Sequence, residues 1–189
     1  MAPPLVSCII PTTKQAEYLL GAIQTFLVQD YVNCELIIVS DRSYDIKNIV
    51  PDHPLISYYY ISSSTSISVK RDFACSKAFG TLIVHWDEDG WRSKDWITKQ
   101  VSYLLSYQGD ICGLRNLNYR ATTTEVSNSL SEDQKRHENF IQIPTMAYLK
   151  SFWDKHPFIK QLNLKIEYYN VPKGAKLIIH NEFKSFISY

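Results

Sequence analysis

Several features are scarce or absent in this chain of 189 residues, and each absence excludes a class of protein. The formal net charge of +1 gives no electrostatic reason to expect a nucleic acid or a membrane surface as a partner. The four cysteines form no C-x-x-C pair and no Cys/His spacing, so no zinc site is predicted. The apolar part of residues 1–10 is too short for a signal sequence or a membrane span.

What remains is typical of a globular protein of the cytoplasm. Hydrophobic residues make up 45% of the chain and charged residues 21%, which is enough apolar material to build a real core. The length favours a single domain over residues 1–189. The cysteines lie far apart, mostly among apolar neighbours, which predicts reduced and buried thiols. They are Cys8, Cys34, Cys75 and Cys112.

Short apolar runs alternate with helical patterns through the first half of the chain. The predicted strands cover residues 5–10, 35–39, 56–61 and 81–86, and the predicted helices cover 16–29 and 66–78. We expect the second helix to be closed by Gly80. The alternation predicts an α/β fold with a parallel sheet covered on both faces. Ligands of such sheets bind beyond the carboxyl ends of the strands, where residues 11–13, 40–43 and 87–89 would meet.

Three adjacent acids, Asp87, Glu88 and Asp89, follow the last of these strands. Like charges at this spacing raise one another's pKa unless a cation or several hydrogen-bond donors lie nearby. The Asp87-x-Asp89 spacing therefore suggests a divalent cation, and oxygen ligands suit Mg2+ or Mn2+. Mg2+ takes few protein carboxylates and completes its shell with water and phosphates, which points to a diphosphate ligand. An alternative remains open, in which Asp87 caps a helix and the other two acids are solvated.

Two cations, Lys70 and Arg71, fall in or near the first turn of the second predicted helix. The helix dipole disfavours cations at that end, and a bound anion such as a phosphate would offset the cost. The alternative is that both are solvated charges near a helix boundary that the sequence locates poorly.

Four segments of the chain carry a resemblance to a known family. They are residues 6–12 (VSCIIPT), 35–43 (ELIIVSDRS), 70–74 (KRDFA) and 85–91 (HWDEDGW). In content, order and spacing they resemble the successive blocks of a family 2 glycosyltransferase of the GT-A fold. The resemblance is dense over residues 5–100 and thinner afterwards, where residues 147–158 are similar to the family's acceptor-side segment.

The resemblance implies a fold and an activity. The fold would be a Rossmann-like α/β/α sandwich with a mostly parallel central sheet. A donor-binding half would lie at residues 1–108 and a minimal acceptor-side half at 109–189. The activity would be the metal-dependent transfer of a sugar from a nucleoside diphosphate sugar, which we expect to be UDP-linked, to an acceptor hydroxyl, with inversion.

The resemblance also implies roles for particular residues. The positions that match contacts to the donor's nucleobase, ribose and diphosphate are Pro11, Thr12, Asp41, Arg71 and Asp87. Asp87 and Asp89 match the D-x-D metal motif. Asp89 would be the ligand proper of Mn2+ or Mg2+, and Asp87 would favour the ribose or a metal-bound water.

Two functional groups of the family have no clear match. The general base is usually an Asp in a downstream Glu-Asp pair, and the candidate here is Glu167, with Tyr168 in the place of the Asp. The family's C-terminal metal-binding His is not evident, because the chain stops at Tyr189. We expect His180 to be structural and His85 to lie in the core or near the site. The implied protein is therefore short, and is either completed by a partner chain or oligomer or binds a nucleotide sugar with weak or no transfer.

The remaining sequence leaves some alternatives open. Residues 119–139 are polar and predict a loop over the active-site edge, either a lid or a surface excursion. The acceptor could be a saccharide, a lipid or a protein hydroxyl. A nucleotidyltransferase ranks last, because residues 11–14 contain no glycine for a phosphate-binding loop.

Overall fold

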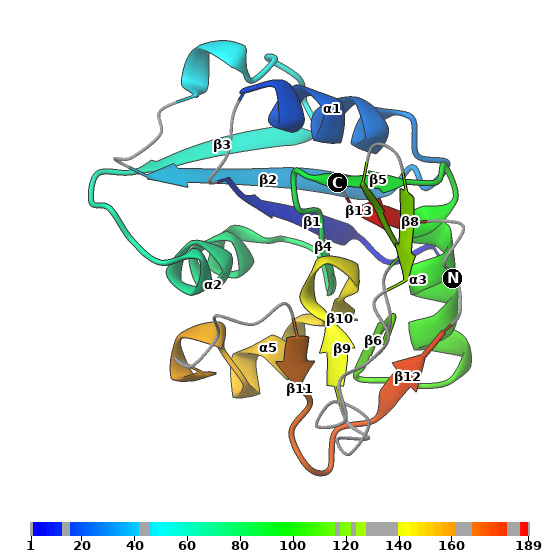
Figure 1. Cartoon of the computed structure of the whole chain (residues 1–189). Coiled ribbons are helices and arrows are strands. Elements are labelled where there is room, and N and C mark those ends of the chain that lie inside the picture. Colours follow the sequence, from blue (N-terminus) through cyan, green and yellow to red (C-terminus); the bar gives the residue numbers. More distant parts are fainter. Residues whose placement is uncertain are drawn as a thin grey trace.

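The computed structural model is a layered α/β molecule with one large sheet (Figure 1). It describes residues 2–12, 16–41, 46–115, 118–121, 124–127, 140–161, 168–180 and 186–188.

Seven strands form the central sheet. They are β1 (Val6–Pro11), β2 (Cys34–Asp41), β3 (Ile56–Ile61), β4 (Leu82–His85), β6 (Ile111–Gly113), β10 (Ala147–Leu149) and β12 (Leu177–Ile179). Their order is β12-β6-β10-β4-β1-β2-β3. The four adjacent strands β4, β1, β2 and β3 run parallel to one another. Strand β10 runs antiparallel between β4 and β6. The predicted mostly parallel sheet is confirmed, and β10 is the exception within it.

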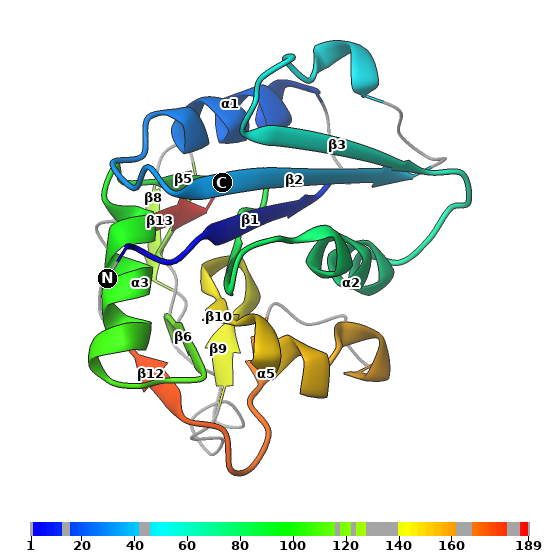
Figure 2. The same ribbon diagram turned by 180° about the vertical axis from the view of Figure 1, so that it is seen from behind.

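Helices cover both faces of this sheet (Figures 1 and 2). They are α1 (Ala16–Leu27), α2 (Ile67–Lys77), α3 (Trp96–Ser106) and α5 (Lys150–Lys155), with short 3-10 turns η1 (Lys47–Ile49), η2 (Ile143–Thr145) and η3 (Phe158–Gln161). Alternate residues of β1 serve the two sides, because successive strand side chains point to opposite faces. Cys8 and Ile10 share a buried cluster with α1 and α3, whereas Ile9 shares one with α2, α5 and η3.

Two smaller sheets complete the fold. Strand β9 (Phe140–Gln142) pairs with β11 (Tyr168–Asn170), and the second sheet holds β5 (Gly90–Arg92), β13 (Phe186–Ser188), β7 (Asn118–Ala121) and β8 (Thr124–Ser127). Strands β7 and β8 form an antiparallel pair. The prediction of a loop over residues 119–139 is therefore wrong where these strands lie, and residues 128–139 are outside the described part of the chain.

The turn between α2 and β4 differs from the sequence-based expectation. Ser66 caps the start of α2 through its side chain, and the helix ends at Ala78 in an extended conformation, without a left-handed glycine. Gly80 is required for another reason. A Cβ atom there would lie 2.6 Å from the Ser7 side chain and 2.7 Å from the backbone oxygen of Leu5. Only glycine lets this turn approach β1 so closely.

The carboxyl end of β4 is fixed to α1 by Trp86. This side chain is fully buried, packs edge-on against Phe26 at 5.9 Å, and donates its indole N–H to the backbone oxygen of Ala22 at 2.9 Å. A buried indole needs such an acceptor, because an unpaired polar group in the core is costly. The acidic loop that follows Trp86 therefore starts from a rigid point.

Candidate functional site

The parallel strands bring the predicted site residues to one edge of the sheet. Thr12 directly follows β1, Asp41 is the last residue of β2, and Asp87 lies two residues after the end of β4. Helix α2 starts beyond the carboxyl end of β3 and runs back beneath the same edge, as Figure 1 shows. Lys70 and Arg71 lie in its first two turns. The predicted meeting is confirmed for the described residues of these segments by contacts among Thr12, Asp41, Lys70 and Glu88, whereas residues 13, 42 and 43 lie outside the described part of the chain.

The three acids of the β4–β5 loop have three different environments. Asp87 is 15% exposed at its side chain and forms an ion pair with Arg71, whose Nη2 lies 3.1 Å from Oδ2. Glu88 is buried and accepts a hydrogen bond of 2.6 Å from the hydroxyl of Thr12. Asp89 is partly exposed. The repulsion expected among adjacent carboxylates is thus reduced by protein groups, and the acids do not form a simple solvated loop.

Asp41 and Lys70 form a second buried pair. The Lys70 ammonium lies 3.2 Å from Oδ2 of Asp41 and donates a hydrogen bond of 2.9 Å to the backbone oxygen of Thr12. Asp41 also accepts from the backbone N–H of Thr65 at 3.0 Å. The alternative that Lys70 and Arg71 are solvated is wrong, because both are buried and both meet carboxylates at the carboxyl edge of the sheet.

Arg92 holds the backbone of the acidic loop. Its guanidinium donates to the backbone oxygens of Asp87 at 3.1 Å and Gly90 at 3.0 Å, and lies 4.6 Å from the centre of the Trp86 ring. Burial lowers the pKa of Arg92 to about 10, and the nearby carboxylates of Asp87 and Asp89 oppose that shift. The group therefore stays charged at neutral pH and adds positive potential beneath the acids.

Beneath the site, His85 belongs to a buried chain of polar groups. Its Nε2 lies 3.0 Å from the hydroxyl of Tyr148, which in turn lies 3.4 Å from the sulfur of Cys75. Burial, followed by the charge of Arg71, lowers the pKa of His85 well below its usual value. Burial likewise raises the pKa of the Cys75 thiol to about 12. His85 is therefore a neutral core residue at pH 7, as expected.

The other predicted structural residues also lie in the interior. All four cysteines are buried and free. His180 is 3% exposed, stacks on Tyr103 with ring centres 4.6 Å apart, and has its Nε2 3.2 Å from the amide nitrogen of Gln100. The expectation that His180 is structural fits this packing. Glu167, the candidate base, lies outside the described residues.

The fit of a divalent cation depends on the acidic loop. Within the described part of the chain, no group of three His, Cys, Asp or Glu side chains is arranged to hold a metal. A cation that takes one or two carboxylates and completes its shell from water and a diphosphate needs no such group. Asp89 is partly exposed and suits that limited role, while the carboxylate of Asp87 is shared with Arg71. The residues fit a cation held together with its substrate better than a resident structural ion.

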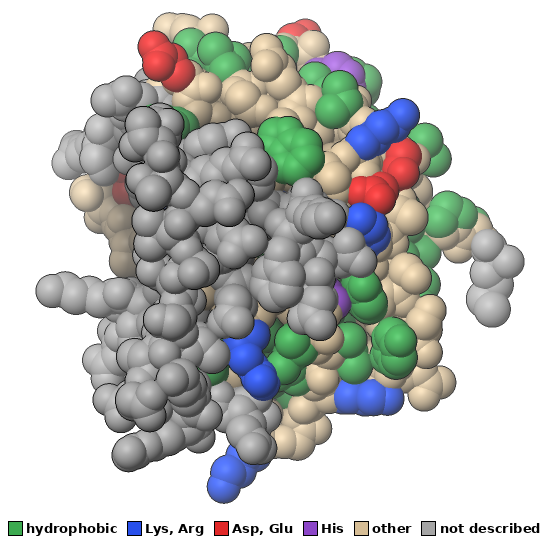
Figure 3. All heavy atoms as spheres, turned by 45° about the vertical axis from the view of Figure 1, so that its right-hand side comes forward, with side chains coloured by type: hydrophobic (Ala, Val, Ile, Leu, Met, Phe, Trp, Pro, Cys, Tyr) green, Lys and Arg blue, Asp and Glu red, His purple; other side chains and the backbone are tan. Residues whose placement is uncertain are grey.

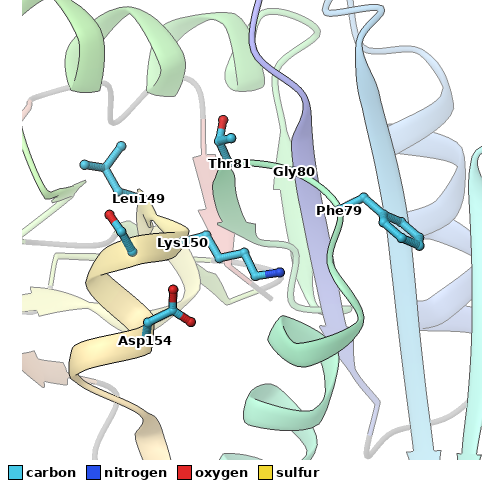
Figure 4. Close-up of a pocket in the computed structure, with 7 residues that line it drawn as sticks. Phe79, Gly80, Thr81, Leu149, Lys150 and Asp154 are labelled. Carbon is cyan, nitrogen blue, oxygen red and sulfur yellow. The ribbon is translucent and has the colours of Figure 1, made fainter.

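Two hollows lie away from this edge. One of 340 Å³ lies at the amino end of β4, between the α2–β4 turn and α5 (Figure 4). Lys150 crosses it to donate to the backbone oxygen of Ala78 at 2.5 Å. The other, of 270 Å³, lies between α5 and the turn before β12 and includes Lys155 and Lys173. Neither contains a residue that the sequence placed in the donor site.

The distribution of surface charge and the apolar character of the helices concern the prediction that neither a nucleic acid nor a membrane is a partner. On the face in Figure 3, the described acidic and basic side chains lie scattered among apolar and polar ones. No helix in the described ranges combines the length and apolar character that crossing a membrane requires.

Sequence reasoning missed three features of this edge. It did not foresee that Glu88 binds Thr12, that Lys70 binds Asp41, or that Arg92 supports the loop backbone. The sequence drew attention to Lys70 and Glu88 without indicating their partners, and for Arg92 the signal was its closeness to the Asp87-x-Asp89 pair.

The fold and this edge define a class of protein. The central sheet, mostly parallel and covered by helices on both faces, has the GT-A fold of the glycosyltransferases to which the chain is structurally similar. The family model for "Glycosyl transferase family 2" matches residues 7–163. The chain therefore belongs to glycosyl transferase family 2.

Individual proteins of known sequence or structure are also similar to the chain. The chain is 30% identical over 110 residues to an uncharacterized glycosyltransferase of Haemophilus influenzae, covering 56% of this chain and 44% of that one. It is similar to the mannosyltransferase PcManGT from Pyrobaculum calidifontis in complex with GDP-Man and Mn2+, with TM-score 0.70, 13% identity, and coverage of 99% and 56%. It is also similar to S. aureus TarS 1-349 in complex with UDP, with TM-score 0.58, 16% identity, and coverage of 80% and 48%. The chain thus spans about half the length of these proteins.

Proposed function

We propose that this protein is a metal-dependent glycosyltransferase that transfers a sugar from a UDP-sugar to an acceptor hydroxyl with inversion. One observation carries the proposal. In a chain of this family, four carboxylates and three cations converge at the carboxyl edge of the sheet, where α/β proteins bind their ligands. Neighbours of the same fold are in complex with UDP or with GDP-Man, and the expectation from the sequence favours UDP.

The proposed donor site has a nucleoside end and a diphosphate end. Pro11, Thr12 and Asp41 at the ends of β1 and β2 would contact the nucleoside. Arg71 would contact the diphosphate beside Asp87. Its Nη2 is used by Asp87, and its buried Nε has no hydrogen-bond partner among the described residues. A buried donor of this kind is normally satisfied, and a phosphate oxygen would satisfy it.

The proposed metal site consists of Asp89 as ligand, with Asp87 in support. A bound Mn2+ or Mg2+ would act as a Lewis acid that neutralises charge on the departing diphosphate. The chain's own contribution is to hold the loop in place, through Arg92 on its backbone and Thr12 on Glu88. Arg71 adds fixed positive charge at the same place, which stabilises the same departing group.

We assign the donor half to residues 1–108 and the acceptor half to 109–189, with Glu167 as the general base. The acceptor is a saccharide, lipid or protein hydroxyl. Four buried free thiols favour a reducing compartment, so we place the protein in the cytoplasm.

A second candidate function is nucleotide-sugar binding without efficient transfer. It is favoured by the pairing of the site's own groups, because the carboxylates of Asp87 and Asp41 already meet Arg71 and Lys70. This candidate would be supported if the chain binds UDP but releases no UDP from a UDP-sugar.

Calorimetric titration with UDP, GDP and CDP, each with and without Mn2+, tests the proposal. We expect UDP to bind, with an affinity that Mn2+ increases. Asp89→Ala should remove that Mn2+ dependence and leave the fold intact, because a partly exposed loop carboxylate contributes little to packing. Asp52→Ala, an exposed carboxylate before β3, is the matched control and should behave like the parent. Mn2+-dependent affinity that survives Asp89→Ala would defeat the metal assignment.

A further inference from the structure

Lys70 is an unusual residue for the position it occupies. It lies four residues after the Ser66 cap of α2, and only 2% of its surface is exposed. A buried charge is costly unless it is paired and hydrogen-bonded. Here the ammonium meets the carboxylate of Asp41 at 3.2 Å and the backbone oxygen of Thr12 at 2.9 Å. Two buried acceptors thus hold one buried cation.

Those two acceptors lie where a nucleoside would need them. The Thr12 oxygen and the Asp41 carboxylate stand at the carboxyl ends of neighbouring strands β1 and β2. The ribose hydroxyls and the imide N–H of uracil are donors, and they need acceptors when a protein buries them. In the described structure, both acceptors are engaged by the ammonium of Lys70.

The neighbouring cation has a different partner. Arg71 reaches the carboxylate of Asp87 in the acidic loop, at the diphosphate end of the proposed site. The two adjacent cations of α2 are therefore divided between the two ends of the edge. Lys70 is not placed as a phosphate contact, although the sequence alone grouped it with Arg71.

We propose that Lys70 sets the affinity and selectivity of the donor site for its nucleoside. Its ammonium competes with the N–H and O–H groups of the nucleoside for the Thr12 oxygen and the Asp41 carboxylate. A carbonyl oxygen and a carboxylate can each accept more than one hydrogen bond, so the ammonium weakens the bonds that a nucleoside makes to these acceptors rather than blocking them. This inference rests on the proposed function, because it takes this edge as the donor site.

The test removes the amine and keeps the apolar stem. Lys70→Met has nearly the same length, whereas Lys77→Met makes the same change at an exposed position in the last turn of α2 and is the control. Calorimetry measures the affinity for UDP and for uridine. Uridine is the sharper probe, because it has no phosphates and so does not sense the lost positive charge.

We expect Lys70→Met to bind uridine about tenfold more tightly than the parent, the effect of relieving competition from one charge-assisted hydrogen bond. Lys77→Met should match the parent. Lys70→Gln keeps a neutral donor and should give a smaller gain, which provides a second test if Lys70→Met does not fold.

The outcomes separate this inference from the proposed function. If a folded Lys70 variant binds uridine no more tightly than the parent does, while the parent still binds UDP, the inference that Lys70 competes with the nucleoside is refuted. The proposed donor site is then retained. Binding by Lys70→Met where the parent binds nothing would support the competition strongly. Absence of UDP and uridine binding in the parent and in both Lys70 variants would remove the proposed site and this inference together.

Discussion

Asp72 joins helix α2 to α5 and η3, and its removal gives the clearest quantitative prediction. One carboxylate oxygen accepts from the Trp153 indole N–H at 2.7 Å and from the backbone N–H of Phe158 at 2.9 Å. The other accepts from the backbone N–H of Ile159 at 2.7 Å. Three donors from α5 and η3 therefore depend on one side chain of α2.

The magnitude follows from these contacts. A hydrogen bond to a charged group contributes about 1.5–3 kcal/mol, but bonds that share one acceptor do not add. The backbone N–H of Ile159 belongs to an exposed residue and can bind water, whereas Phe158 is buried. We therefore expect Asp72→Ala to lower the free energy of unfolding by about 2–4 kcal/mol, which at this length is a fall in Tm of roughly 5–15 °C.

Urea denaturation followed by tryptophan fluorescence measures the effect. Asp72→Asn keeps one acceptor oxygen and should lose about half as much free energy of unfolding. Asp154→Ala, an exposed carboxylate on α5, is the control and should stay within about 0.5 kcal/mol of the parent. If Asp72→Ala had the same free energy of unfolding as Asp154→Ala, the three hydrogen bonds would not stabilise the packing of α2 against α5 and η3.

Two further predictions concern the base and the buried histidine. Glu167→Gln should leave UDP affinity unchanged and lower the release of UDP from a UDP-sugar, and undiminished turnover would rule Glu167 out as the base. Because burial lowers the pKa of His85 in the folded state, only the unfolded chain takes up this proton as pH falls below about 6.5, and stability declines in that range. His85→Gln should therefore flatten the acid side of a plot of unfolding free energy against pH, by at most about 1.4 kcal/mol per pH unit. An unchanged slope would show that His85 does not titrate as inferred.

The local elements were the predictable part of the fold. The predicted strand at residues 56–61 coincides with β3, and the predicted helix at 66–78 differs from α2 by one residue at each end. These segments are long enough to show a period. Strand β10 has only three residues, too few to show one, and its place between β4 and β6 depends on long-range pairing. The polar strands β7 and β8 were missed because their composition is that of a loop.

The candidate site was predictable as a location and not as a set of contacts. The rule that parallel strands end at one edge was enough to bring Thr12, Asp41 and Asp87 together. Which acid meets which cation depends on side-chain conformations contributed by separate elements. Nothing in the sequence distinguishes Lys70 from Arg71 as the partner of Asp41, and only the direction in which each leaves α2 decides it.

Helix α2 places three successive residues against three separate parts of the molecule. Lys70 meets the ends of β1 and β2, Arg71 meets the acidic loop, and Asp72 meets η3. Neighbouring residues on a helix point about 100° apart, so a one-residue insertion before Lys70 would turn all three away from their partners together. Evolutionary changes of length in this region should therefore accumulate in the connection at residues 62–65, where the chain can absorb them, and should be selected against within the first turns of α2.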